Sequence, residues 1–380
     1  MKVSLTDICD FQGGTQPPKD EWIDQPARGY VRMLQIRDFT QSDKNYIEYV
    51  KDTRKLKTCI EDDILIGRYG ASIGKILTGL AGAYNVAIVK TIPDEKVVSK
   101  KYLYWYLNSQ YFQRFISNVG SRAAQAGFNK NDLGAAQIPL VDKERQEEIC
   151  EVLEKANKLI SLRKQQLAKL DELIKARFVE MFGDPVSNPL HWKKVKLSEL
   201  ADIKIGPFGS LLHKEDYVTG GHPLVNPSHI INGKIIVDND LTLTEGKYFE
   251  LSAYRLKKND VVLGRRGEMG RCAVVDEDGL LCGTGSLLIR TNGTVTADYI
   301  QKIISFPTFK KTIEDMAVGQ TMPNLNVPIV SNFMIIVPPL SVQKDYYDFV
   351  ECVDQQKQTV QQSLDRLELM KKAMMQEYFG

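Results

Sequence analysis

Basic side chains gather in two short segments of similar sequence, where they could bind an anionic partner. Gly67-Arg68-Tyr69-Gly70 and Gly264-Arg265-Arg266-Gly267 each follow a short apolar run, a pattern typical of a hairpin tip. Long basic side chains at such tips can reach phosphates or the edges of guanines. The candidate binding residues are Arg68, Tyr69 and Lys75 in the first half, and Arg265, Arg266 and Arg271 in the second. An exposed basic turn is the alternative, and the paired placement favours nucleic-acid binding.

Two polar loops and two glycine-rich loops supply further candidates. Amide groups can read adenine, and amine and hydroxyl groups can contact phosphates. The polar-loop candidates are Gln125, Asn129 and Lys130, with Gln320, Asn324 and Asn326, and the glycine-rich loops add Thr15, Lys19, Ser210 and Lys214. Side chains of these types also cap helices and stabilise turns, so each one taken alone has a structural interpretation as well.

The residue patterns of common active sites are missing. The sequence has no G-x-x-x-x-G-K-[ST] phosphate loop, and the spacing of Gly264, Gly267 and Gly270 does not fit a dinucleotide site. All four histidines lie in the second half, whereas a duplicated catalytic or metal site needs counterparts in the first. We therefore expect a non-catalytic chain with no metal or cofactor of its own.

An internal repeat positions the candidate residues. The segment from Val3 to Asp7 returns as the segment from Val195 to Glu199, and each precedes a glycine-rich loop. The same number of residues separates Gly67 from Gly264 as separates Gly183 from Gly380. In each half, short strands lead to a helix, expected at Lys101 to Phe115 and at Asp298 to Met316, then to the polar loop and a last strand. This order predicts two repeated α+β globules.

Each globule is followed by a long helix with an apolar seam. With Arg163 and Arg177 filling the gaps in the first helix, the seam positions alternate in steps of four and three residues, the a/d pattern of a coiled coil. The seam residues are Ile149, Leu153, Ala156, Ile160, Leu167, Leu170, Ile174 and Met181 in the first helix, and Val350, Val353, Val360, Leu364, Leu367, Met374 and Tyr378 in the second. The two helices are therefore expected to pair. Lys357 and Lys371 interrupt the second seam, and one explanation is that they face a partner subunit rather than the other helix.

Composition sets broader limits. A chain of 380 residues is longer than one hydrophobic core usually accommodates, so two domains are expected. A composition of 43% hydrophobic and 26% charged residues is ordinary for a globular protein. No apolar run is long enough to span a membrane, and the first residues do not resemble a signal peptide. Six cysteines without a C-x-x-C pair predict free thiols in a reducing cytoplasm. Because the net charge is only +2, any nucleic-acid surface must be local.

Over essentially its whole length, the sequence resembles the specificity subunits of type I restriction-modification enzymes. The resemblance is carried by the hairpins ILIGRYGASIGK and VVLGRRGEMGR, the helix starts IPLVDKERQEEI and VPPLSVQKDYYDF, and the helix ends FVEMFGDP and MQEYFG. It implies an α+β fold with a pseudo-twofold repeat: target-recognition domains at 1–140 and 185–338, a central spacer helix at 141–184 and a C-terminal helix at 339–380, the two helices forming an antiparallel coiled coil. The first half departs from this repeat because it lacks a counterpart of Asn188-Pro189-Leu190-His191-Trp192.

The resemblance also implies a function. In that family each target-recognition domain reads one half of a bipartite DNA site, while the coiled coil sets their spacing and docks two copies of a methyltransferase (modification) subunit. The implied partners are double-stranded DNA, these subunits and, through the complex, restriction and translocase subunits, with no membrane. S-adenosylmethionine and ATP with Mg²⁺ are expected on the partner subunits. The alternative is a coiled-coil scaffold that bridges other proteins without contacting DNA.

Overall fold

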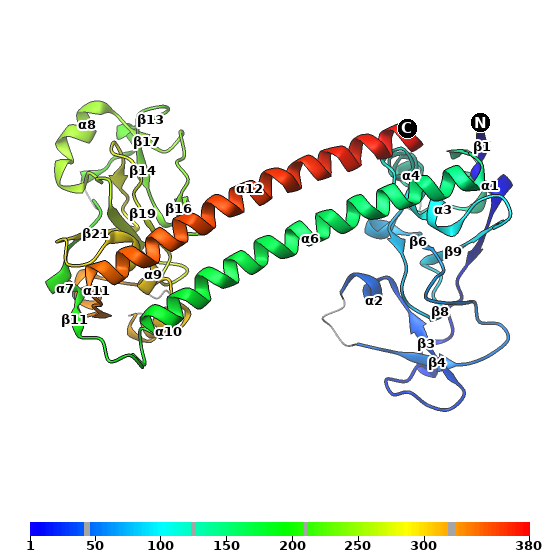
Figure 1. Ribbon diagram of the computed structural model, residues 1–380, viewed down its shortest axis with the longest axis horizontal. Coiled ribbons are helices and arrows are strands. Elements are labelled where there is room, and N and C mark those ends of the chain that lie inside the picture. The colour runs from blue at the N-terminus through cyan, green and yellow to red at the C-terminus, as the bar shows by residue number, and fades with distance from the viewer. Residues whose placement is uncertain (42–45, 123–126, 209–210, 318–323) are drawn as a thin grey trace. The chain divides into compact units, whose positions relative to one another are not determined.

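The computed structural model describes residues 1–41, 46–122, 127–208, 211–317 and 324–380 (Figure 1). The chain divides into two compact units, one formed by residues 1–167 and 359–380 and the other by residues 168–358. Each unit therefore combines one globule with portions of both long helices. No helix within the described ranges is both long enough and apolar enough to cross a membrane.

Two four-stranded sheets form the first globule. The first sheet has the order β2 (Cys9–Gly13), β9 (Ile88–Pro93), β6 (Leu65–Gly67), β7 (Ile76–Leu77), with all neighbours antiparallel. The second has the order β4 (Tyr49–Lys51), β3 (Tyr30–Leu34), β8 (Gly82–Tyr84), β5 (Thr58–Cys59), and only β3 and β8 are parallel. In addition, β1 (Lys2–Ser4) pairs with β10 (Gln137–Pro139), which joins the start of the chain to the strand before the first long helix.

The second globule repeats this arrangement. Its first sheet has the order β12 (Ala201–Ile205), β21 (Ser286–Thr291), β18 (Asp260–Gly264), β19 (Cys272–Val274), again antiparallel throughout. Its second sheet has the order β13 (Tyr217–Val218), β17 (Thr242–Leu243), β14 (His222–Val225), β20 (Leu281–Cys282). The pair β11 (Lys194–Lys196) and β22 (Met334–Ile336) matches β1 and β10. The predicted internal repeat of α+β globules is thus confirmed, and each predicted basic tip directly follows a central strand, β6 or β18.

The helix expected after the strands is two helices in each globule. The first globule has α3 (Lys100–Leu107) and α4 (Gln110–Arg122), and the second has α9 (Ala297–Ile304) and α10 (Pro307–Met316). The prediction of one continuous helix was therefore wrong. Ser109 accepts a hydrogen bond from the Phe112 N–H (3.2 Å), which starts a new helix. Pro307 occupies the first turn of α10, where a main-chain N–H would have no partner within the helix, so proline loses no hydrogen bond there.

The two long helices are confirmed as α6 (Lys143–Phe182) and α12 (Leu340–Phe379). Within each unit their residues pair in opposite directions, as in an antiparallel coiled coil. In the first unit Lys371 Nζ donates to Asn157 Oδ1 (2.7 Å) and Lys164 pairs with Glu368 (2.7 Å). In the second unit Lys357 pairs with Asp171 (2.7 Å) and the Tyr346 hydroxyl donates to Ile174 O (3.4 Å).

These contacts overturn the partner-facing explanation for the lysines in the second seam. Lys357 and Lys371 both reach across to α6, and the ammonium of Lys371 also lies 5.2 Å from the centre of the Trp105 ring. A long lysine side chain can lie along an apolar seam while its charged end finds a polar partner beside it. The lysines thus belong to the helix pair itself.

The helices are anchored to the globules by repeated contacts. Phe379 is fully buried with its ring 5.1 Å from that of Tyr102, and Phe182 is fully buried 5.2 Å from the ring of Tyr299. Near the helix starts, the buried amide of Gln146 accepts from the Ser99 N–H (2.9 Å) and donates to the carbonyls of Val97 and Val141, both at 2.9 Å. Because these partners are main-chain atoms, this anchor tolerates changes in the globule's side chains.

Candidate nucleic-acid interface

The first arginine of each basic tip is tied to a distant loop. Arg68 Nε donates to Phe128 O (2.9 Å), and Arg265 Nε donates to Leu325 O (3.0 Å). Their main-chain N–H groups also match, since Arg68 donates to Ala87 O (2.8 Å) and Arg265 to Gly285 O (2.9 Å). Both arginines thus hold the hairpin against the loop that precedes α5 (Lys130–Leu133) or α11 (Val327–Ser331).

Three arginines of these tips have no acidic partner among the described residues. In the part of the chain that the structure describes, Arg68, Arg265 and Arg266 form no ion pair. Burial, followed by the neighbouring charge of Arg266, lowers the pKa of the Arg265 guanidinium below its ordinary value. A partly buried guanidinium without a carboxylate can accept an external anion, because charge-assisted hydrogen bonds to phosphate are strong.

The next residue of each tip faces outward. Tyr69 is 40% exposed and its ring lies 5.0 Å from the Arg68 guanidinium carbon. The equivalent Arg266 is exposed. In the first globule a hollow of about 610 Å³ opens here, lined by Arg68, Tyr69, Phe115, Gly127, Phe128 and Asn129 among others. The structure therefore brings the tip and the polar loop together in one place.

The third residue of each tip differs between the globules. Lys75 is exposed, and its side chain forms no hydrogen bond or ion pair with the described residues. Arg271 instead pairs with Glu268 (3.0 Å) and donates to Pro227 O (3.2 Å). Glu268 also pairs with Lys310 (2.9 Å), and these two cations, Lys310 first, lower the pKa of its carboxyl. Arg271 is thus the less available of the two for an external partner.

The polar-loop candidates serve partly as helix caps. Asn129 Oδ1 accepts from the Asp132 N–H (3.1 Å) and Asn326 Oδ1 from the Ile329 N–H (2.9 Å). Lys130 pairs with Asp10. Asn324 Oδ1 is buried without a hydrogen-bond partner among the described residues. The other two candidates of these loops, Gln125 and Gln320, lie outside the described residues.

The glycine-rich loop candidates do not join the tips in a shared contact within the described chain. Thr15 Oγ1 accepts from the Lys57 N–H (3.4 Å). Lys19 pairs with the buried Glu48 and its ammonium lies 3.8 Å from the centre of the Trp22 ring. Ser210 and the side chain of Lys214, which begins the short helix η4 (Lys214–Asp216), lie outside the described part.

Sequence reasoning missed two clusters on segments with little internal similarity. In the first globule, Arg37 pairs with Glu48 and lies 4.8 Å from the ring centre of Tyr46, which is 60% exposed. In the second, Arg255 lies 4.5 Å from the ring centre of Tyr248 and 4.7 Å from that of Phe249. In the sequence, the signal for these clusters was an arginine near aromatic residues. That pattern is common, and the internal repeat did not support it here, so it did not single out these residues.

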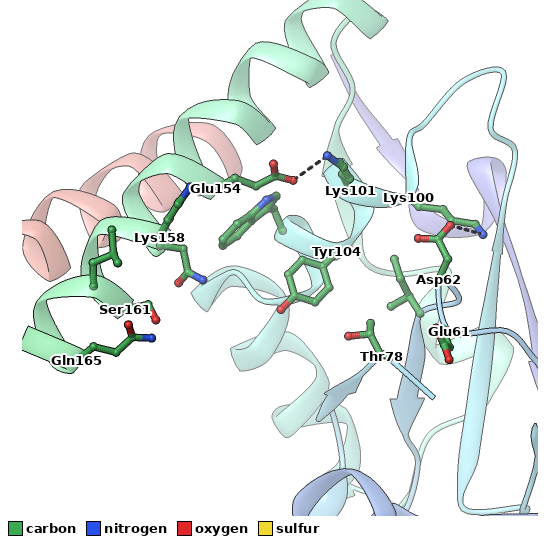
Figure 2. Close-up of a pocket in the computed structure, with 15 residues that line it drawn as sticks. Glu61, Asp62, Thr78, Lys100, Lys101, Tyr104, Glu154, Lys158, Ser161 and Gln165 are labelled. Atoms are coloured by element: carbon green, nitrogen blue, oxygen red, sulfur yellow. Dashed lines mark hydrogen bonds and ion pairs between the residues drawn. The ribbon is translucent and has the colours of Figure 1, made fainter. Parts of the chain in front are cut away.

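A groove of about 690 Å³ in the first unit lies between α3, α6, the turn before β6 and the turn after β7, and it contains none of the predicted site residues (Figure 2). Lys101 pairs with Glu154 (3.1 Å) and Lys100 with Asp62 (3.2 Å), so much of its charge is compensated internally. Within the described ranges, no three His, Cys, Asp or Glu side chains are grouped as metal ligands. The groove does not offer chemistry comparable to that of the tips.

Comparison with known proteins agrees with the fold. The chain matches the family described as the type I restriction modification DNA specificity domain over residues 1–172 and 189–369. It is 22% identical to the type I restriction enzyme MjaVIII specificity subunit of Methanocaldococcus jannaschii, over 98% of this chain and 90% of that protein. It is also 22% identical to the MjaIX specificity subunit of the same organism, over 91% of this chain and 85% of that protein.

Two solved structures show the same fold. One, from work on the assembly and conformational transition of the type I R-M system, has a TM-score of 0.67 at 15% identity, covering 100% of this chain and 97% of that chain. The S subunit of a type I restriction-modification system from M. genitalium has a TM-score of 0.54 at 16% identity, covering 100% and 96%. With two matched segments that span most of its length, the chain belongs to the family of type I restriction-modification DNA specificity proteins.

Proposed function

We propose that each globule reads one half of a bipartite DNA site, so that the chain directs a type I restriction-modification complex to its target. The observation that carries this proposal is the repeated basic tip. In both globules an arginine that has no acidic partner among the described residues holds the polar loop against the hairpin, and an exposed Tyr69 or Arg266 follows it. Such a tip combines a charge for phosphates with a side chain for base edges.

The chemistry of methylation and cleavage is then supplied by other subunits. S-adenosylmethionine, and ATP with Mg²⁺, belong on those partners in this proposal. This chain supplies the DNA-reading surfaces and the helices between them. A scaffold that does not contact DNA is less favoured, because the matched family is defined by DNA specificity and because a pure scaffold does not require unpaired arginines at equivalent tips.

Duplex binding measured across a range of salt concentrations tests the proposal. Phosphate contacts release counterions, so the logarithm of the binding constant should fall steeply and linearly with the logarithm of salt concentration. A DNA-reading chain should in addition select one bipartite sequence from a randomised duplex pool. Weak binding with a flat salt dependence and no selected sequence would favour the scaffold.

Arg266→Ala is expected to weaken DNA binding more than Arg271→Ala. Arg266 is exposed without an ion pair in the described chain, whereas Arg271 is already paired with Glu268. Loss of a base contact should cost ~1–3 kcal/mol and relax one position, and loss of a phosphate contact should reduce the salt slope by about one. Titration of both variants with the wild-type site measures this. Equal affinities for all three proteins would show that the tip does not face the DNA.

We also propose that two copies of one modification subunit dock on the helix pair. A repeat presents equivalent surfaces twice. Leu173 on α6 and Met370 on α12 occupy equivalent positions in the repeat, and they are 46% and 49% exposed. Exposed apolar side chains at equivalent positions of the two helices are suited to a protein contact.

Leu173→Asp and Met370→Asp are each expected to remove one modification subunit from the assembly, and the double variant to remove both. A carboxylate at the centre of an apolar contact is costly to bury without a partner. Native mass measurement of the reconstituted complex gives the number of copies. Leu173→Met and Met370→Leu keep apolar side chains and serve as matched controls. A wild-type assembly that holds a single copy would contradict the proposed stoichiometry.

A further inference from the structure

The residue after Arg68 lies against a specific position of the polar loop. In the first globule Tyr69 forms an isolated antiparallel bridge with Gly127, one residue before the Phe128 carbonyl that Arg68 binds. In the second globule the equivalent positions hold Arg266 and Asn324, and Asn324 likewise precedes the Leu325 carbonyl that Arg265 binds. Leu325 N–H also donates to Arg265 O (3.0 Å), so Leu325 is bound to Arg265 through both its N–H and its carbonyl.

The two members of the first pair fit each other closely. A Cβ atom added at Gly127 would lie 2.6 Å from Cδ1 and 2.8 Å from Cε1 of Tyr69. Nonbonded carbon atoms prefer separations of about 3.5–4.0 Å, so no larger residue fits while the tyrosine ring stays in place. Tyr69 and Gly127 therefore depend on one another.

The second pair has different chemistry in the same register. Arg266 offers a planar fork of donors, which suits the two acceptors of guanine, and Asn324 offers an amide. The Tyr69 and Gly127 pair offers a ring and a hydroxyl, with no cation at that position. The hydrogen bonds of Arg68 and Arg265 are thus shared between the globules, while the side chains at the two paired positions differ.

We propose that residues 69 and 127, and likewise 266 and 324, form one specificity-determining pair in each globule, held in place by Arg68 and Arg265 as positioning residues. The inference rests on the proposed function, because it assumes that the globules read DNA. It assigns a guanine contact to Arg266 in one half-site and a contact without a guanidinium to Tyr69 in the other.

The test exchanges one pair for the other within the full chain. Tyr69→Arg with Gly127→Asn rebuilds the second pair in the first globule, and Arg266→Tyr with Asn324→Gly makes the reverse exchange. Each chain is produced together with its modification subunits, and bound sequences are selected from a randomised duplex pool. The first exchange should introduce a preference of about 10- to 100-fold for guanine at one position of one half-site. The reverse exchange should abolish a guanine preference at one position of the other half-site.

The positioning role needs its own variant. Arg68→Lys keeps the positive charge but replaces the planar fork that holds the Phe128 carbonyl. It should relax selection in one half-site while the other half-site and the salt slope stay unchanged. Gly127→Ala with Tyr69 retained should affect the same half-site, because the added methyl displaces the ring.

The outcomes distinguish a failure of the specificity pair from a failure of the proposed DNA-reading function. If the wild-type chain selects a bipartite sequence and both exchange variants bind DNA with that same sequence preference, the specificity pair is wrong and the proposed function stands. A change in both half-sites from a single exchange also refutes the pair. If the wild-type chain selects no sequence, the proposed function fails and this inference fails with it.

Discussion

A seven-residue insertion in each long helix is expected to leave the protein folded and to lengthen the gap between the two half-sites by up to about three base pairs. The insertions lie between Ile160 and Leu167 and between Lys357 and Leu364, which are equivalent positions of the internal repeat. One heptad adds about 10 Å of helix, and B-DNA rises 3.4 Å per base pair. The prediction rests on the proposal that the paired helices set the spacing.

The matched control inserts two residues at the same places. This insertion shifts the a/d seam, so charged residues would move into it and apolar residues out of it. We expect loss of the cooperative unfolding transition before any change in spacing. The sequence methylated in cells reports the gap, and circular dichroism reports the helices. A folded, active heptad variant that still requires the original gap would show that the helices do not set the spacing.

The sequence predicted the fold where its signals were local and repeated. The displacement shared by Gly67 and Gly264, and by Gly183 and Gly380, fixed the equivalence of the halves because glycines mark turns that few other residues can make. The heptad spacing in turn predicted the two long helices. The break between α3 and α4 was missed because a serine such as Ser109 does not by itself mark a helix start, and its capping role appears only in the folded chain. Pro307, in contrast, was a sequence signal for the start of α10.

The candidate site was predicted less completely because its key contacts join distant residues. Arg68 and Arg265 were chosen for their charge, but their hydrogen bonds to Phe128 O and Leu325 O link segments that no periodicity connects. The capping role of Asn129 was more accessible, since an acidic residue follows it at the capping-box spacing in Asp132. Even this signal does not decide whether the amide also contacts a base, and that part of the prediction stays untested.

Replacing residues 1–140 with the first globule of a related protein is expected to change one half of the recognised sequence and leave the other half intact. The helix start tolerates such a graft, because Gln146 binds the main chain at Ser99 and Val97. The end of α12 places a stricter requirement on the graft, because Phe379 packs on the side chains of Tyr102 and Tyr106.

A donor globule that keeps tyrosines at those two places should therefore fold on the existing helices, and a donor without them provides the contrasting control. Affinity for the original site should fall because each base pair that the donor globule mismatches costs ~1–3 kcal/mol, roughly additively, while the other half-site is still bound. Affinity for the hybrid site should rise to the wild-type level. Mapping methylated adenines in cells that carry the hybrid gives both halves at once. If both halves changed together, the two globules would not be independent readers, and the repeat would reflect folding rather than recognition.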